Sequence, residues 1–146
     1  MRVPTVWTIG YEQTTMAEFL AALTAAGVEV VADVRAVASS RRPGFSKTAL
    51  AANLLEAGIG YVHFRALGTP ADGRAAARAG KHAALERIYA GQLELPEALA
   101  QGAELAELAR EKKVALLCYE RDAGGCHRTL LREAMLGEFE AVDLVP

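Results

Sequence analysis

The stretch LLCYERDAGGCHR, residues 116–128, carries the pattern that decides the fold. It continues a short apolar run, residues 114–117, which is long enough for one interior strand. Gly124 and Gly125 give the backbone the freedom of a turn, and from Cys126 onwards apolar residues recur at helical spacing. The stretch therefore predicts a buried strand, a glycine loop and a helix that begins near Cys126.

The start of that helix is a candidate anion site, because Cys126, His127 and Arg128 lie in or near its first turn. Backbone N–H groups are unpaired there and the helix dipole is positive, which favours a bound anion and a thiolate. We expect a phosphate-type anion beside the N–H groups of Gly125 to His127, with help from Arg128 and Arg35. Cys126 is the candidate nucleophile or redox-responsive thiol.

Strand and helix patterns alternate along the rest of the chain. Apolar runs rich in β-branched residues predict strands, at residues 3–9, 28–34, 59–64 and 140–145. Helices are predicted from a cap at Thr14 or Thr15 to Gly27, from a cap at Ser46 to Glu56, in the second half of the alanine-rich segment after Pro70, and at residues 96–112. This alternation predicts a single α/β domain over residues 1–146, with a mostly parallel sheet of about five strands and helices on both faces.

Polar residues follow the ends of four predicted strands. They are Tyr11 with Glu12, Asp33 with Arg35, His63, and residues 118–128. Ligands of parallel sheets bind beyond the carboxyl ends of the strands, so we expect these clusters to form one pocket.

Basic residues concentrate near this rim, although the chain as a whole is not basic. Its content of 52% hydrophobic and 23% charged residues is typical of a globular protein, and its formal net charge of −2 argues against coating of nucleic acid. Guanidinium groups bind phosphate and carboxylate groups in bidentate fashion. The expected ligand contacts are Gly10, Tyr11, Arg35, Arg41, Arg42, Gly125 and Arg128.

Two functions fit these residues. In the first, the pocket is an enzyme site for a small phosphorylated or nucleotide-like substrate, with Cys126 as nucleophile. The candidate acid or base groups are Asp33, Glu120 and His127. In the second, the arginines and Tyr11 bind a nucleic-acid backbone or an unpaired base without chemistry.

A small anionic ligand is the preferred partner, because it needs fewer positive charges than a nucleic-acid strand does. A pocket closed by residues 68–87 would favour the enzyme, whereas an open basic groove would favour the nucleic-acid module. A third alternative is a structural protein whose arginine network only holds loops in place.

Metal and cofactor motifs receive little support. Cysteine-phosphatase and rhodanese loops need an arginine about six residues after the cysteine, whereas residue 124, six after Cys118, is glycine. Walker and dinucleotide-binding glycine motifs are missing, so no cofactor is expected. A zinc site from Cys118, Cys126, His127 and His63 would need adjacent Cys and His side chains to reach one metal, which is rare. We expect His63 to be a strand-end histidine with satisfied hydrogen bonds.

The sequence begins without the apolar segment of a signal peptide and has no run of transmembrane length. We therefore expect a cytoplasmic protein with no membrane partner. In that reducing compartment Cys118 and Cys126 are expected to be free thiols, of which Cys126 is the more reactive.

In these motifs the chain resembles the prokaryotic family catalogued as domain of unknown function 488. The similar blocks are residues 8–12, 33–35 with 40–46, 58–63 with 67–68, and 117–120 with 126–128. Gln13 stands where glycine is common in the family. The resemblance implies a single α/β domain with a polar strand-end pocket, and it implies no particular reaction.

Overall fold

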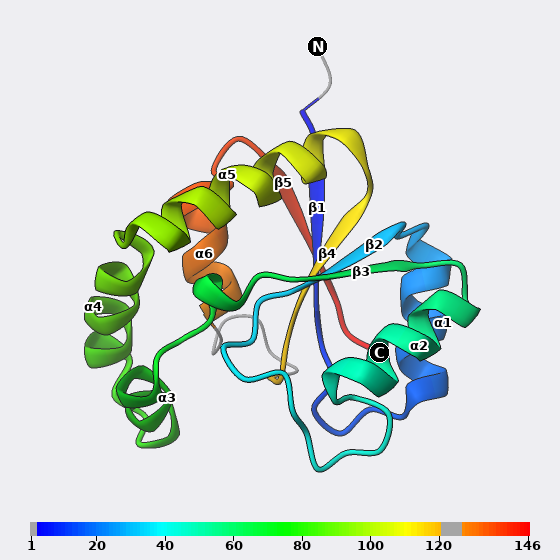
Figure 1. The fold of residues 1–146 in the computed structure, drawn as a ribbon, viewed down its shortest axis with the longest axis horizontal. Helices are drawn as coiled ribbons and strands as arrows, with labels where there is room; N and C mark the ends of the chain where they lie inside the picture. Colours follow the sequence, from blue (N-terminus) through cyan, green and yellow to red (C-terminus); the bar gives the residue numbers. More distant parts are fainter. Residues whose placement is uncertain (1–2, 121–126) are drawn as a thin grey trace.

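The computed structural model describes residues 3–120 and 127–146, and its centre is a five-stranded sheet of order β3-β2-β4-β1-β5 (Figure 1). The strands are β1 Thr5–Gly10, β2 Val30–Asp33, β3 Gly60–His63, β4 Val114–Cys118 and β5 Glu140–Leu144. Each strand pairs with its neighbours in parallel, so the carboxyl ends of the strands share one edge of the sheet. The fold class predicted from the sequence is confirmed.

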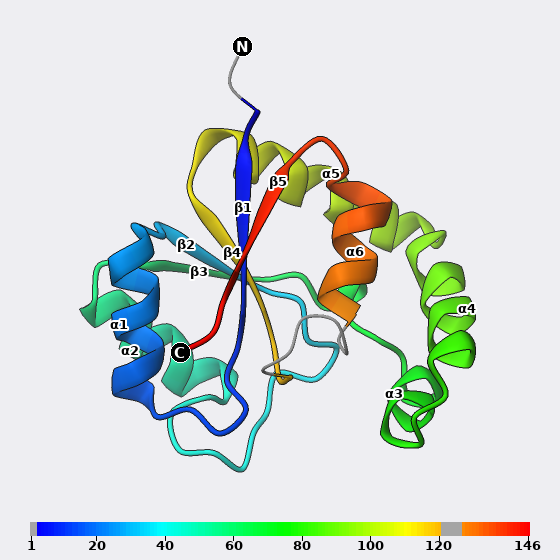
Figure 2. The same cartoon turned by 180° about the vertical axis from the view of Figure 1, so that it is seen from behind.

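Helices cover both faces of the sheet, as Figure 2 shows from behind. One face packs against α1 Met16–Ala26 and α2 Lys47–Glu56. The other face packs against α4 His82–Leu93, α5 Pro96–Glu111 and α6 His127–Met135. A 3₁₀ turn, Arg65–Leu67, and a further helix, α3 Ala71–Arg78, precede α4. Within the described ranges, no helix is long and apolar enough to cross a membrane.

The central strand β4 is buried along its whole length. Its side chains alternate between the two faces, so Ala115 and Leu117 pack in the core beside α1 and α2, while Val114 and Leu116 pack in the core on the opposite face. This double burial explains the uninterrupted apolar run that identified the strand in the sequence.

The first helix begins and ends as the sequence predicts. Thr15 caps it, because Thr15 Oγ1 accepts a hydrogen bond from Glu18 N at 3.1 Å and Glu18 Oε1 accepts one from Thr15 N at 3.0 Å. Gly27 ends the helix with a φ of 73°, a conformation that favours glycine. The chain turns at Gly27 and continues into the buried strand β2.

The segment after Pro70 differs from its prediction. Only its second half was expected to be helical, whereas the structure has two helices there, α3 and α4, separated near Gly80 with a φ of 72°. Residues 71–78 are mostly alanine and arginine, whose high helix propensity outweighs the glycine among them. The additional helix α3 brings new side chains to the strand-end edge.

Candidate functional site

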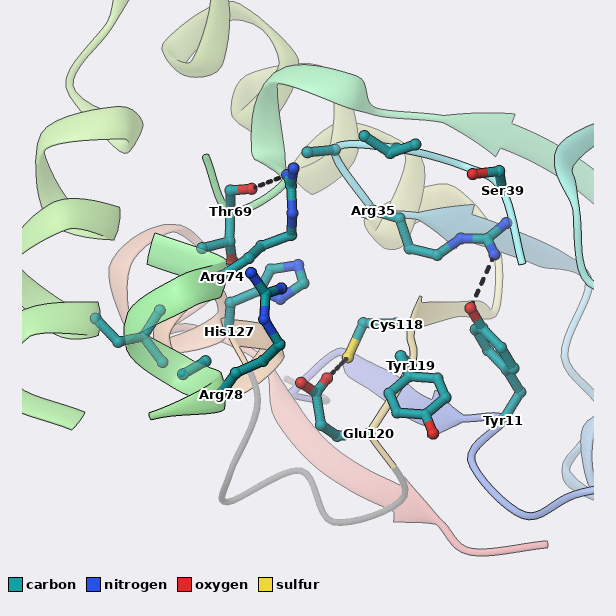
Figure 3. A pocket seen from close by; sticks show the side chains of 14 residues that line it. Tyr11, Arg35, Ser39, Thr69, Arg74, Arg78, Cys118, Tyr119, Glu120 and His127 are labelled. Atoms are coloured by element: carbon teal, nitrogen blue, oxygen red, sulfur yellow. Dashed lines mark hydrogen bonds between the residues drawn. The ribbon is translucent and has the colours of Figure 1, made fainter. Parts of the chain in front are cut away.

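A pocket of about 480 Å³ lies at the carboxyl edge of the sheet (Figure 3). Its walls come from the ends of β1, β2 and β4, from the first residue of α6 and from α3. The charged and hydrogen-bonding side chains that line it include Tyr11, Arg35, Arg74, Arg78, Glu120 and His127. Polar residues that follow three separate strands thus meet in one pocket, as the parallel topology predicts.

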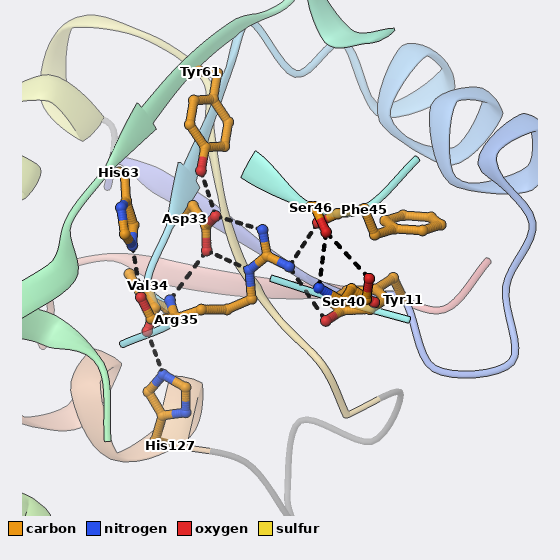
Figure 4. A network of polar contacts seen from close by, with 10 residues as sticks. All are labelled: Tyr11, Asp33, Val34, Arg35, Ser40, Phe45, Ser46, Tyr61, His63 and His127. Atoms are coloured by element: carbon orange, nitrogen blue, oxygen red, sulfur yellow. Dashed lines mark hydrogen bonds and ion pairs between the residues drawn. The ribbon is translucent and has the colours of Figure 1, made fainter. Parts of the chain in front are cut away.

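Asp33 and Arg35 form a buried ion pair behind this pocket (Figure 4). Arg35 Nε donates to Asp33 Oδ1 at 2.8 Å and Arg35 Nη2 donates to Oδ2 at 2.7 Å, while Tyr61 Oη donates to Oδ2 at 2.5 Å. Burial alone would lower the pKa of Arg35, but the hydrogen bonds and charge of Asp33 outweigh it and raise the pKa. Asp33 therefore anchors Arg35 and is not part of the pocket lining.

The rest of the Arg35 guanidinium group organises the loop after β2. Arg35 Nη1 donates to the Tyr11 hydroxyl at 3.2 Å and to the Phe45 carbonyl at 2.8 Å. The Tyr11 ring stacks on Phe45 with centroids 4.7 Å apart. All three guanidinium nitrogens are engaged, so Arg35 borders the pocket as a structural anchor.

His127, a predicted acid or base, lies on the pocket wall at the start of α6. Its Nε2 lies 2.7 Å from the Val34 carbonyl oxygen, which only accepts hydrogen bonds, so Nε2 carries the proton of the neutral ring. Burial, with a smaller contribution from the charge of Arg128, lowers the pKa of His127 to about 4, although the bond to Val34 and the charge of Asp33 act in the opposite direction. The imidazole is therefore neutral at pH 7.

His63 has a comparable bond, because its Nε2 lies 2.7 Å from the carbonyl oxygen of Arg35. This contact confirms the expected strand-end histidine with a satisfied hydrogen bond.

Glu120 contributes a carboxyl group to the pocket lining. Burial raises its pKa, against the opposing influence of its backbone hydrogen bond and of the positive charge of Arg128. Glu120 Oε2 lies 3.4 Å from Cys118 Sγ. This carboxyl group therefore takes up a proton at a higher pH than an exposed glutamate would.

Cys118 corrects one expectation from the sequence. It is disulfide-bonded, so it is not the free thiol that we expected. The chain has one other cysteine, Cys126, and both Cys126 and Gly125 lie outside the described residues.

Four other expected ligand residues lie outside the pocket lining. Arg128 is fully buried, and its Nη2 donates to the Glu120 carbonyl at 2.6 Å, which holds the backbone after β4 in place. Arg42 Nη2 donates to the Thr14 carbonyl at 2.6 Å. Arg41 is exposed in the same loop, and Gly10 pairs with Cys118 in the sheet.

The model of the family described as "Domain of unknown function DUF488" matches residues 15–135 of the chain. The chain belongs to this family. The matched region runs from the cap of α1 to the end of α6, and it includes the strand-end edge from Arg35 to His127. No curated protein and no solved structure matches this DUF488 chain.

Arg74 and Arg78 line the pocket of this DUF488 chain, and sequence reasoning missed both of them. They lie four residues apart on α3, so they project from one face of the helix into the pocket lining. Arg74 Nη1 donates to the Thr69 carbonyl at 2.8 Å, whereas Arg78 makes no hydrogen bond or ion pair with any described residue. The spacing of the two arginines would have indicated a shared face if the segment had been recognised as a helix.

Tyr119, which follows β4, was also missed as a site residue. It lines the pocket and is 48% exposed, whereas the expected contact Tyr11 is only 3% exposed.

Within residues 3–120 and 127–146 of this DUF488 chain, no group of three His, Cys, Asp or Glu residues is placed to hold a metal ion.

Proposed function

We propose that the pocket binds a small molecule with a phosphate-type anionic group and that Glu120 acts as acid or base on it. The observation that carries this proposal is the pair of arginines, Arg74 and Arg78, on one wall of the pocket that Glu120 also lines. Guanidinium groups match phosphate oxygens in charge and in hydrogen-bond geometry. The arrangement supports anion binding next to a group that can transfer a proton.

The size of the pocket supports a small ligand. Its volume of about 480 Å³ falls within the range of roughly 300–1,000 Å³ that is typical of small-molecule sites. Helix α3, part of the segment at residues 68–87, forms one of its walls. A ligand of this size needs only a few positive charges, which suits a chain with a formal net charge of −2.

Glu120 is a better candidate for proton transfer than His127. Burial raises the pKa of Glu120 towards neutrality, where acid–base groups are most effective. A pKa of about 4 makes His127 a weak base, so we assign it a positioning role through its bond to Val34. Because Cys118 is disulfide-bonded and Cys126 lies outside the described residues, the proposal assigns no thiol nucleophile.

The alternative, a nucleic-acid-binding module, would use Arg41 and Arg42. Neither lines the pocket, and the Arg42 guanidinium group donates to the Thr14 carbonyl. The position of both arginines outside the pocket, and the bond of Arg42 to Thr14, favour binding of a small ligand over binding of a nucleic-acid strand.

Thermal melting in inorganic phosphate, compared with chloride of equal ionic strength, tests the proposal. Bound phosphate should stabilise the fold by about 2.7 kcal/mol at a hundredfold excess over Kd. Arg78→Ala should lose most of this stabilisation. Arg87→Ala is the matched control, because Arg87 is an exposed arginine on α4 outside the pocket lining, and it should keep the stabilisation. Equal stabilisation of the wild type and Arg78→Ala would refute the proposal.

A titration of labelled single-stranded oligonucleotide at two salt concentrations tests the alternative. Each phosphate contact on a single strand contributes roughly −0.7 to the log–log salt slope. Submicromolar binding at physiological salt that is lost in Arg41→Ala/Arg42→Ala would favour the nucleic-acid module.

A further inference from the structure

Tyr119 presents an aromatic ring to the pocket. Tyr119 is 48% exposed and belongs to the pocket lining, so its side chain has surface that a ligand could contact. It follows directly after the buried strand β4, and its carbonyl oxygen accepts a hydrogen bond from Glu12 N at 2.8 Å. The backbone that carries the ring is therefore held in place.

The ring is also supported from the side of the protein. Tyr119 meets the Tyr11 ring edge to face, with centroids 5.4 Å apart and an interplanar angle of 80°. Tyr11 in turn stacks on Phe45 and accepts a hydrogen bond from Arg35. Because Tyr11 is 3% exposed and stacked on Phe45, the exposed aromatic surface at this end of the pocket belongs to Tyr119.

Figure 3 shows Tyr119 and the two arginines of α3 on different sides of the pocket. The space between them, within a pocket of about 480 Å³, is larger than one phosphate group requires. Val37 and Leu85 add apolar lining, and Glu120 adds a hydrogen-bonding group next to the tyrosine. The pocket therefore combines a cationic end, an aromatic end and a polar group between apolar walls.

We infer that the ligand is a nucleotide, whose base stacks on Tyr119 while its phosphate binds at Arg74 and Arg78. This inference rests on the proposed function, because it requires an anion at the arginines. Stacking on an aromatic ring suits any base, since every base has a π face. Glu120 lies where it can hydrogen-bond to a sugar hydroxyl or to an amino group of the base.

Isothermal titration calorimetry with the four common nucleoside 5′-monophosphates and with ribose 5-phosphate tests the inference. The wild type should bind at least one nucleotide about tenfold or more tightly than ribose 5-phosphate. Tyr119→Ala and Tyr119→Leu should remove this difference, because neither side chain offers an aromatic face for a base to stack on. Tyr119→Phe, which keeps the aromatic face, should preserve the difference.

Equal affinity of the wild type for nucleotides and ribose 5-phosphate, with both lost in Arg78→Ala, would overturn the inference and leave the proposed function intact. A preference for nucleotides that survives in Tyr119→Ala would also overturn it. Failure of every phosphorylated probe to bind would refute the proposed function and the inference together.

Titration with a short single-stranded oligonucleotide distinguishes a free nucleotide from a nucleotide within a nucleic-acid strand. Binding no tighter than that of the mononucleotide, with the same loss in Tyr119→Ala, identifies a free nucleotide. Tighter binding of the oligonucleotide with that loss identifies a nucleic-acid strand whose base occupies the pocket.

Discussion

The backbone of Gly68 approaches Ala36 so closely that a Cβ atom on Gly68 would lie 2.1 Å from the Ala36 amide nitrogen. Its φ of −81° is open to any residue, so the close approach and not the backbone conformation requires glycine here. Ala36 lines the pocket and follows Arg35 directly, so this contact holds the 3₁₀ turn at Arg65–Leu67 against the rim of the site.

Gly68→Ala should therefore destabilise the fold by at least about 2 kcal/mol, because the Cβ would meet backbone atoms that cannot rotate away. Urea denaturation measures the loss. Gly91→Ala is the control, since Gly91 lies in α4 with no atom within 4 Å of an added Cβ. It should stabilise the protein by about 0.5–1 kcal/mol through helix propensity. Similar effects of the two substitutions would contradict the close contact.

Removal of both partners of the Asp33–Arg35 pair should lower the free energy of unfolding by less than the two single removals added together. Asp33→Ala leaves a buried guanidinium group without its carboxylate, which typically costs about 3–5 kcal/mol. Asp33→Ala/Arg35→Met removes the uncompensated charge, so its loss should be smaller than the sum of the single losses by at least about 1 kcal/mol. Additive losses in urea denaturation would show that the pair contributes little.

The sheet could be predicted from the sequence because a strand that is buried on both faces has an uninterrupted apolar sequence. The run at residues 114–117 is apolar since β4 is covered on both faces, and parallel topology then collects the strand ends at one edge. The sequence also grouped Asp33 with Arg35 at the end of a predicted strand, and the structure has the two side chains paired there.

The roles of the arginines could not be predicted in the same way. A charged residue near a strand end can serve a ligand or the fold, and the difference depends on contacts made by distant residues. The donors of Arg35 are taken by Asp33, Tyr11 and Phe45, and Arg128 holds the Glu120 carbonyl. The arginines that line the pocket from α3 lie instead in a segment whose helix was only half predicted.

The two tyrosines illustrate the same point. Both follow strand ends and both line the pocket, yet Tyr11 is stacked on Phe45 while Tyr119 keeps half of its surface exposed. Phe45 comes from a loop more than thirty residues away from Tyr11 in the chain, so the local sequence does not indicate which ring is covered.

His127 should make the fold less stable in mild acid. Its pKa is about 4 in the folded protein and 6.5 in the unfolded chain, so the unfolded chain binds the additional proton between these values. The stabilising contribution of the neutral ring is therefore complete above pH 6.5 and is lost as the pH falls towards 4. Between pH 7 and pH 4.5 the loss amounts to about 2 kcal/mol.

Comparison with His127→Gln isolates this contribution. Glutamine keeps an N–H donor for the Val34 carbonyl but does not titrate, so its free energy of unfolding should fall by about 2 kcal/mol less than that of the wild type over the same pH range. The raised pKa of Glu120 has the opposite effect, because it increases the free energy of unfolding as the pH falls. Glu120 is present in both proteins, so its contribution cancels in the comparison. Urea denaturation at pH 7 and pH 4.5 measures both changes. Parallel losses in the two proteins would mean that His127 takes up its proton in the folded state as readily as in the unfolded chain.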